Sequence, residues 1–405
     1  MTKAKHIQLI LILGSMTALG PFSIDMYLPG FSGIAKDLHT TVTDVSMSLS
    51  SYFIGISFGQ LLYGPLLDRF GRKKPLFIGL LVYILASLGC VFVTNISMFI
   101  GLRFIQAVGS CAATVASIAM VRDLFPVKEI PNVLSKLMLV VGLSPMLAPT
   151  IGGYVTSYWG WHIVFLILMC MGIFVLIASQ LGLPKTHEPD LSISLRPKPI
   201  INNFLSIIKV PQFYTYALTG SIAFSGLFVY VAASPILFMD ILKVDATTYG
   251  WIFAFMSLSF IGSSQLNSVL LRHFSSEQMI FGALVSQIII SLVFLILAIN
   301  GVLGLYGTIT MLFLFLACLG ISNPNTAGLT LAPFAKNTGS ASALMGASQL
   351  GIGALASFVV EIFLKDSMIP IVVIMTFTTI TAFIVLNIGK RKIKNITVSS
   401  KEDKI

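Results

Sequence analysis

The sequence predicts an all-α integral membrane protein with twelve transmembrane helices arranged as two six-helix bundles. Of the 405 residues, 56% are hydrophobic and only 10% are charged. A soluble chain of this length could not cover its surface with so few charges. Apolar segments of about 20 residues, the length that spans a bilayer as a helix, recur along the whole sequence.

Twelve such segments can be counted, and each is expected to be one transmembrane helix. Their bounds are 7–31, 45–67, 75–94, 98–121, 132–155, 162–183, 211–239, 248–271, 279–300, 303–333, 339–363 and 369–389. The tenth is long and contains Pro324 and Pro333, so we expect a break within it. Membrane helices tolerate such breaks where neighbouring groups satisfy the freed backbone.

The distribution of basic residues predicts the orientation. With the N-terminus in the cytoplasm, 21 lysines and arginines fall on the inner side, three fall on outer loops and Arg103 lies within a span. Lys and Arg concentrate on the cytoplasmic side of membrane proteins. Both termini are therefore expected in the cytoplasm, and the net charge of +10 reflects the membrane and gives no indication of nucleic-acid binding.

A polar, proline-containing stretch at 184–210 divides the chain after six spans. We interpret it as a cytoplasmic linker between an N-terminal bundle, 1–183, and a C-terminal bundle, 211–389, followed by a basic cytoplasmic tail, 390–405. Asp25–Pro29 is weakly similar to Val231–Pro235, and Gly64–Arg69 to Asn267–Arg272. Two repeated halves with a substrate site between them are a common transporter design. The second copies lack the aspartates, so ion chemistry is expected in the first half.

The loop between the second and third spans carries five charges and two glycines, from Gly64 to Lys74. Asp68 and Arg72 are four residues apart and would share a face of a continued helix. Gly64 is expected to permit close helix approach, and Gly71 a sharp turn. A solvated run of charges would explain the basic residues but not this ordered spacing.

Asp25 and Arg103 are the charges deepest within the predicted spans, and each lies 18 residues from the cytoplasmic end of its helix. At ~1.5 Å per residue both would lie about 27 Å above the inner face. Charged side chains at such depth are costly and mark functional sites. Asp25 is predicted to bind a proton with Arg103 as its partner. A static ion pair that only braces the two helices is the alternative.

Enzymatic function is not indicated. The sequence has no His-Glu-x-x-His pair, nucleophile elbow or phosphate-binding loop. Its four cysteines fall inside spans without metal-ligand spacing, so neither a metal nor a cofactor is expected. Without an ATP-binding motif, energy for transport would come from a proton gradient.

Several motifs resemble those of the major facilitator superfamily, over nearly the whole chain. The Gly64–Lys74 loop, Arg103-Phe-Ile-Gln106-Ala-Val-Gly109 and Pro145–Gly153 look like motifs of that superfamily. Further segments are similar to drug exporters of the bicyclomycin-resistance (Bcr/CflA) type: Asp25–Pro29, Ala148–Gly153, Gly160–Phe165 and Gly339–Ala343. His162 and Lys185 depart from the usual pattern of that group.

The resemblance implies roles for three groups of residues. Gln106 and Gly109 belong to the motif around span four. A cytoplasmic gate latch is implied at Gly64, Asp68, Arg69, Gly71, Arg72, Lys73 and Asp123. An antiporter-type helix kink is implied at Gly142, Pro145, Pro149, Gly152 and Gly153. In the latch, Arg72 would pair with Asp123, and Asp68 would accept from the start of span eleven near Gly339.

The substrate cavity is the least constrained part of the prediction. Aromatic and apolar residues near Asp25 and in spans seven and eight are the candidates: Phe22, Tyr27, Leu28, Phe228, Tyr230 and Trp251. A broad apolar cavity with one carboxylate suits lipophilic neutral or cationic compounds. Glu361, near the outer end of span eleven, is expected at the membrane interface.

We therefore expect a proton-driven secondary transporter that exports lipophilic neutral or cationic drugs across the bacterial inner membrane by alternating access. It would be a multi-pass monomer whose partners are substrate, protons and the lipid bilayer. The alternative is a facilitator-fold importer or exporter dedicated to a metabolite such as an amino acid, small peptide or siderophore. A membrane enzyme or structural scaffold is least favoured.

Overall fold

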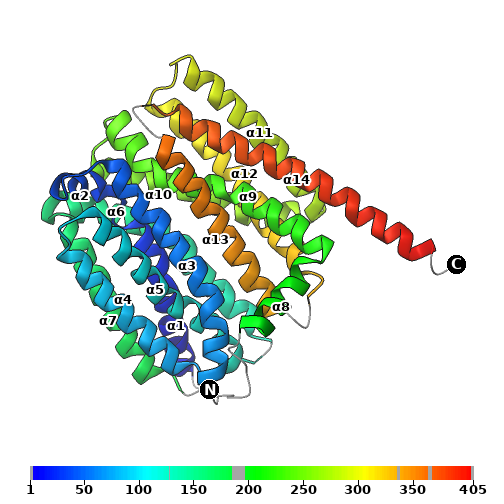
Figure 1. Cartoon of the computed structure of the whole chain (residues 1–405), viewed down its shortest axis with the longest axis horizontal. Helices are drawn as coiled ribbons and strands as arrows, with labels where there is room; N and C mark the ends of the chain where they lie inside the picture. The colour runs from blue at the N-terminus through cyan, green and yellow to red at the C-terminus, as the bar shows by residue number, and fades with distance from the viewer. Residues whose placement is uncertain (1–2, 127, 185–196, 335–337, 364–366, 403–405) are drawn as a thin grey trace. The chain divides into compact units, whose positions relative to one another are not determined.

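A computed structural model describes residues 3–126, 128–184, 197–334, 338–363 and 367–402, and within these ranges all regular structure is helical (Figure 1). The elements in chain order are α1 (Lys3–Asp25), η1 (Leu28–Gly30), α2 (Phe31–Asp37), α3 (Val42–Phe70), α4 (Lys73–Val91), α5 (Ile96–Leu124), α6 (Ile130–Trp159), α7 (Trp161–Gly182), α8 (Pro197–Ile208), α9 (Pro211–Pro235), η2 (Ile236–Ile241), α10 (Ala246–Leu270), α11 (Ser276–Ile299), α12 (Leu305–Leu331), α13 (Thr338–Phe363) and α14 (Ile369–Glu402).

The all-α membrane fold is confirmed. In the described part of the chain, 11 segments are long and apolar enough to cross a membrane. One of them runs through α1, η1 and α2, and another joins α9 to η2. The predicted eighth span corresponds to α10, which has 25 residues. It is not among the 11 because polar residues such as Ser259, Ser263 and Asn267 lower its mean hydropathy.

The backbone contacts divide the chain into two compact units. The first contains Met1–Leu195 with Ser234–Ser257, and the second contains Arg196–Ala233 with Leu258–Ile405. The division passes through α9 and α10: the last two residues of α9, η2 and the first half of α10, which lie within Ser234–Ser257, group with the N-terminal helices. The division into bundles 1–183 and 211–389 stays a prediction.

In the first unit, α5 packs against α3 and α4, α4 also packs against α7, and α1 packs against α6 (Figure 1). Small residues allow these helices to approach closely. A Cβ atom added to Gly109 of α5 would lie 2.6 Å from the backbone nitrogen of Tyr83 in α4. One added to Gly55 of α3 would lie 2.7 Å from the carbonyl oxygen of Phe104 in α5. This close packing places α5 where it can reach the end of α1.

In the second unit, α11 packs against α12 and α14, and α13 packs against α8, α12 and α14. Helix α12 is continuous past Pro324 and ends at Leu331, two residues before Pro333. The break expected within the tenth span is therefore absent, because α12 runs unbroken through Pro324 and simply ends before Pro333. Two further helical segments were not predicted: α8 lies within the predicted linker, and α14 extends to Glu402 through most of the predicted tail.

Candidate functional site

The first membrane span is interrupted beside Asp25. Helix α1 ends at Asp25, a short 3₁₀ turn follows at Leu28–Gly30, and α2 continues from Phe31. The backbone nitrogen of Met26 donates to the carbonyl of Phe22 over 3.0 Å. The last carbonyl groups of a helix lack intrahelical donors. Inside a membrane such groups need partners from neighbouring helices.

Arg103 of α5 supplies a donor to this helix end. Its Nη2 donates to the carbonyl oxygen of Ser23 over 2.8 Å, and its Nη1 donates to the Oε1 of Gln106. The side chain has no exposed surface. A cation beside the C-terminal carbonyls of a helix also interacts favourably with the helix dipole. Arg103 therefore caps α1 two residues before Asp25.

Aromatic rings enclose the guanidinium group. Its carbon lies 4.1 Å from the ring centroid of Tyr27, 4.3 Å from that of Tyr52 and 5.8 Å from that of Phe165. Cations within about 6 Å of such rings are attracted by the ring quadrupole, most strongly where water is absent. The planar shape of arginine suits this arrangement, whereas lysine presents a point charge.

Hydroxyl and amide groups extend the network across four helices. The Nε2 of Gln106 donates to the Oγ of Ser87 over 2.8 Å, and Ser23 shares a 2.8 Å hydrogen bond with the hydroxyl of Tyr83. The hydroxyl of Tyr27 shares a 3.0 Å hydrogen bond with that of Ser48, and the hydroxyl of Tyr52 shares one of 2.9 Å with that of Ser110. The end of α1 is thus fixed to α3, α4 and α5.

Asp25 itself is 4% exposed. Among the described residues, no hydrogen bond or ion pair of its carboxyl group is found, and none joins it to Arg103. Tyr249 of α10 lies within electrostatic range of Asp25 and shares a 2.8 Å hydrogen bond with Ser234. Arg103 is bound instead to the backbone at Ser23, two residues before Asp25, so the static ion pair between the two side chains is not found among the described contacts. The role of Arg103 as partner of Asp25 in proton binding stays a prediction.

The charged loop forms a compact ion network. The Nε of Arg72 contacts the Oδ2 of Asp123 at 2.9 Å, and its Nη1 contacts Asp68. The predicted Arg72–Asp123 contact is therefore present. Burial acts to lower the pKa of Arg72, but hydrogen bonds to Asp123 and Asp68 outweigh it and raise that pKa above the ordinary value. Arg72 therefore remains charged.

Other residues of this loop shape the turn. The Nζ of Lys73 donates to the carbonyl of Gln180 at the end of α7 over 2.8 Å. Gly71 has φ of 77°, a conformation that favours glycine. A Cβ atom on Gly64 would meet nothing within 4 Å, and the expected close helix approach at this residue stays a prediction. Arg69 is partly buried. The proposed contact of Asp68 with the start of span eleven joins the two units and stays a prediction.

The glycines of α6 lie against other backbone segments. A Cβ on Gly152 would collide with the carbonyl oxygen of Met26, next to Asp25, and one on Gly153 would lie 2.5 Å from that of Ala246. The Oγ1 of Thr150 donates to the carbonyl of Gly250 over 3.2 Å. Pro145 and Pro149 lie inside the helix, and Gly142 is partly buried. The predicted kink region thus packs against both the α1–α2 break and the start of α10.

The predicted cavity residues differ in exposure. Tyr27 and Leu28 have no exposed surface, whereas Trp251 is 58% exposed. Phe228 and Tyr230 are buried and Phe22 is partly exposed. Their contact with substrate stays a prediction. Glu361 is only 1% exposed, so its side chain is buried in the protein, and its position at the membrane interface stays a prediction.

Sequence reasoning missed the polar contacts of the second unit. The Nδ2 of Asn325 donates to the Oδ1 of Asn267 over 2.7 Å, and the Nε2 of Gln349 donates to the Oδ1 of Asn323 over 3.0 Å. The first pair is buried, and the second is partly exposed. Amide side chains are uncommon in membrane spans, so the presence of these residues in the predicted spans could have indicated polar contacts there. It also missed Tyr52 and Tyr83, which look like ordinary apolar residues in the sequence.

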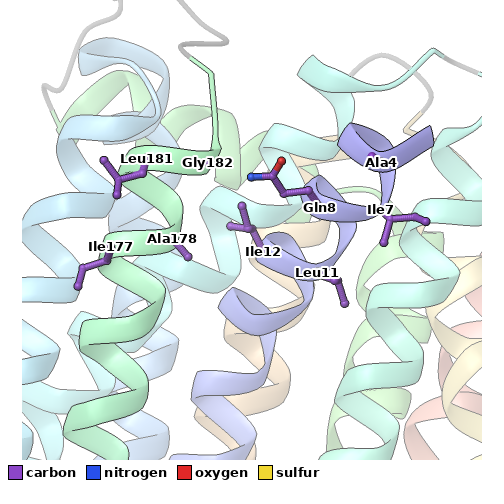
Figure 2. A pocket seen from close by; sticks show the side chains of 9 residues that line it. All are labelled: Ala4, Ile7, Gln8, Leu11, Ile12, Ile177, Ala178, Leu181 and Gly182. Carbon is purple, nitrogen blue, oxygen red and sulfur yellow. The ribbon is translucent and has the colours of Figure 1, made fainter. Parts of the chain in front are cut away.

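A groove of about 620 Å³ lies between the ends of α1 and α7 (Figure 2). It is lined almost entirely by apolar residues: Ala4, Ile7, Gln8, Leu11, Ile12, Ile177, Ala178, Leu181 and Gly182. The amide of Gln8 lies between the two helices. Within the part of the chain that the structure describes, no group of three His, Cys, Asp or Glu residues could hold a metal ion.

Sequence comparison identifies the class of protein to which this helical architecture belongs. Residues 13–358 match the family model for the Major Facilitator Superfamily. The chain therefore belongs to the major facilitator superfamily, a family of membrane transporters.

Its relatives include resistance proteins. The chain is 33% identical over 361 residues to a bicyclomycin resistance protein homolog of Haemophilus influenzae, covering 89% of this chain and 90% of the relative. It is 25% identical over 367 residues to multidrug resistance protein D of Escherichia coli, covering 88% and 89%. A crystal structure of a D-xylose-proton symporter has the same fold, with a TM-score of 0.74 and 13% identity over 93% of this chain and 97% of that one.

Proposed function

We propose that this protein is a proton-driven exporter of lipophilic neutral or cationic drugs, acting by alternating access in the bacterial inner membrane. The observation that carries the proposal is Asp25, a buried carboxyl group at a helix break within a membrane span. An isolated carboxylate in an apolar interior costs several kcal/mol. Proton binding removes that cost, so Asp25 is suited to alternate between a protonated and an ionised state.

Arg103 contributes a positive charge next to the helix end that carries Asp25. The guanidinium is bound to the Ser23 carbonyl and enclosed by aromatic rings, so it provides a fixed positive charge near the carboxyl group. A cationic substrate near Asp25 would favour the ionised carboxylate, and proton binding would then favour release of the substrate. Competition of this kind couples drug export to proton entry.

Packing around Asp25 provides a route from protonation to conformational change. Met26 follows Asp25 directly and touches Gly152 of α6, while Tyr249 of α10 lies within electrostatic range of Asp25. A change of charge at Asp25 would alter its interactions with two other helices at once. We assign the Arg72–Asp123 contact to a latch that stabilises one of the alternating states.

The relatives support a drug as cargo, since their names refer to bicyclomycin resistance and multidrug resistance. One observation favours the alternative of a more polar metabolite. The partly exposed amide pair Asn323–Gln349 lies in α12 and α13, and polar groups in spans rarely face lipid. These amides would suit a substrate with hydrogen-bonding groups.

Accumulation of antibiotics and dyes in pump-deficient bacteria tests the proposal. Cells that express this chain should accumulate less of several lipophilic compounds. An uncoupler, or the Asp25→Asn substitution at equal membrane abundance, should abolish that difference. Unchanged accumulation across the panel would contradict drug export and favour a metabolite. Reduced accumulation that survives the uncoupler would contradict proton coupling.

A further inference from the structure

Helix α8 has three different faces although it has only 12 residues. Side chains at spacings of three and four residues share one face of a helix. Phe204 and Ile207 form one apolar face. A second apolar face consists of Ile201, Leu205 and Ile208, which follow the spacing i, i+4, i+7. Asn202 and Ser206 lie on the remaining, polar side.

The first apolar face is docked on the second unit. Ile207 is 1% exposed and belongs to a buried cluster with Phe213 and Ala217 of α9 and Ala341 of α13. Phe204 packs against the same cluster. This anchoring fixes the rotation of α8, so the direction of its other faces is determined by the fold.

The second apolar face remains exposed in the structure. Ile201 is 52% exposed, Leu205 47% and Ile208 43%. Exposure of large aliphatic side chains to water is unfavourable in proportion to the apolar surface exposed. A contiguous apolar stripe of this kind marks a contact surface.

The covalent connection identifies what meets this stripe. Only Lys209 and Val210 separate α8 from Pro211, where the membrane-spanning segment Pro211–Ile241 begins. Helix α8 is therefore held at the membrane surface. Lys209 is exposed, and Asn202 and Ser206 are exposed on the polar side. An apolar face, a polar face and a bordering lysine are the features of a helix that lies in the lipid interface.

We propose that α8 is an interfacial helix that inserts Ile201, Leu205 and Ile208 among the lipids at the membrane surface beside α9. Because its other apolar face is docked on α9 and α13, α8 connects the second unit to the lipid headgroup layer. With the cytoplasmic orientation predicted from the charge distribution, this layer contains anionic lipids, which would attract Lys209.

Site-directed spin labelling of the full chain in lipid nanodiscs tests the position of α8. Single cysteines would replace Ile201, Leu205 or Asn202 in a Cys170→Ser background, because Cys170 is the exposed cysteine among the four. The Cys170→Ser parent, treated in the same way, measures labelling of the buried cysteines. All three substituted positions are exposed, so the docked face that anchors the helix is left unchanged.

Labels at 201 and 205 should collide more with lipid-soluble oxygen than with water-soluble nickel chelate, and the label at 202 should show the reverse. A label at 205 that is as accessible to nickel as the label at 202 would place the helix in water and overturn the proposal. Immobilised labels at 201 and 205 that neither reagent reaches would also overturn it, because protein would then cover the stripe. Neither readout depends on transport.

Discussion

At the residue scale, the central finding is that Arg103 is a helix cap enclosed by aromatic rings. Its donors are directed to the Ser23 carbonyl and to Gln106, and Asp25 lies just beyond the capped helix end. Arg103 therefore influences Asp25 by stabilising the end of the helix that holds the carboxyl group in place.

Substitution of Arg103 by lysine tests this role. Lysine keeps the charge but cannot reproduce the planar group between Tyr27 and Tyr52 or its two directed donors. We expect a loss of about 1.5–3 kcal/mol of stability, the range for hydrogen bonds that involve charged groups. Fluorescence-detected thermal unfolding in detergent would measure it. Arg122→Lys, at an exposed position of the same helix, is the control, and equal unfolding temperatures for both variants would contradict the cap.

At the residue scale, the sequence predicts that Asp25 and Arg103 lie at a similar depth, but it does not predict which atoms Arg103 contacts. Counting residues along two helices placed Asp25 and Arg103 at the same level, since rise per residue is fixed. Which atoms the guanidinium meets depends on the rotation of α5 and on the break after α1. Neither is determined by a single sequence pattern.

At the scale of elements, the close approach of α6 to the break in the first span is the contact most sensitive to side-chain volume. Gly152→Ala would direct its Cβ into the carbonyl oxygen of Met26. We expect a cost of about 1–3 kcal/mol, as for other overpacked sites. Gly101→Ala is the matched control because its Cβ would meet nothing within 4 Å. Thermal unfolding that does not distinguish the two variants would show that the approach is not tight.

The start of α10 gives a pH-dependent prediction. Asp245 lies just before the helix and accepts hydrogen bonds from the backbone nitrogens of Thr247 and Thr248, each at 3.0 Å. A hydrogen bond from the side chain of Thr248, with these backbone bonds, lowers the pKa of Asp245 below its ordinary value of 3.8. Because the folded state has the lower pKa, the ionised carboxylate stabilises the fold above that ordinary value. The contribution is lost as pH falls through the folded pKa.

Asp245→Ala should therefore destabilise the protein by about 1 kcal/mol at neutral pH, as loss of a helix cap does. The difference from the unsubstituted protein should shrink below pH ~4. Asp245→Asn keeps a capping oxygen and should retain most of the stability without the pH dependence. Denaturation monitored from pH 3 to pH 7 measures all three proteins. A difference that is constant over this range would contradict the ionised cap.

Elements were predictable to different degrees for a physical reason. Long apolar segments must form helices in a membrane, so the spans could be found from composition. Helix α8 could not be found in this way, because it is short and lies in a polar, proline-containing stretch. Its two apolar faces can be distinguished only once the docked face is known. The continuity of α12 past Pro324 depends on neighbouring groups that are far away in the sequence.

At the scale of the whole molecule, a buried carboxyl group in a membrane span and a charged loop occur together in a chain that belongs to the major facilitator superfamily. Membrane-buried carboxylates in transporters bind and release protons during the cycle. Two roles of Asp25 can be distinguished experimentally. A static structural group would change stability when substituted, whereas a proton carrier would change coupling in a protein that remains folded.

The most direct test is proton movement in proteoliposomes that contain the purified chain and an internal pH indicator. When a lipophilic substrate such as tetraphenylphosphonium is added, the wild-type protein should move protons across the membrane in the direction opposite to the substrate. Protons should therefore appear in the compartment that the substrate leaves. The Asp25→Asn variant, shown to be folded by its unfolding temperature, should bind the substrate without moving protons, while Asp25→Glu should retain part of the coupling. Substrate-dependent proton movement of wild-type size in Asp25→Asn would contradict the assignment of Asp25 as the proton carrier.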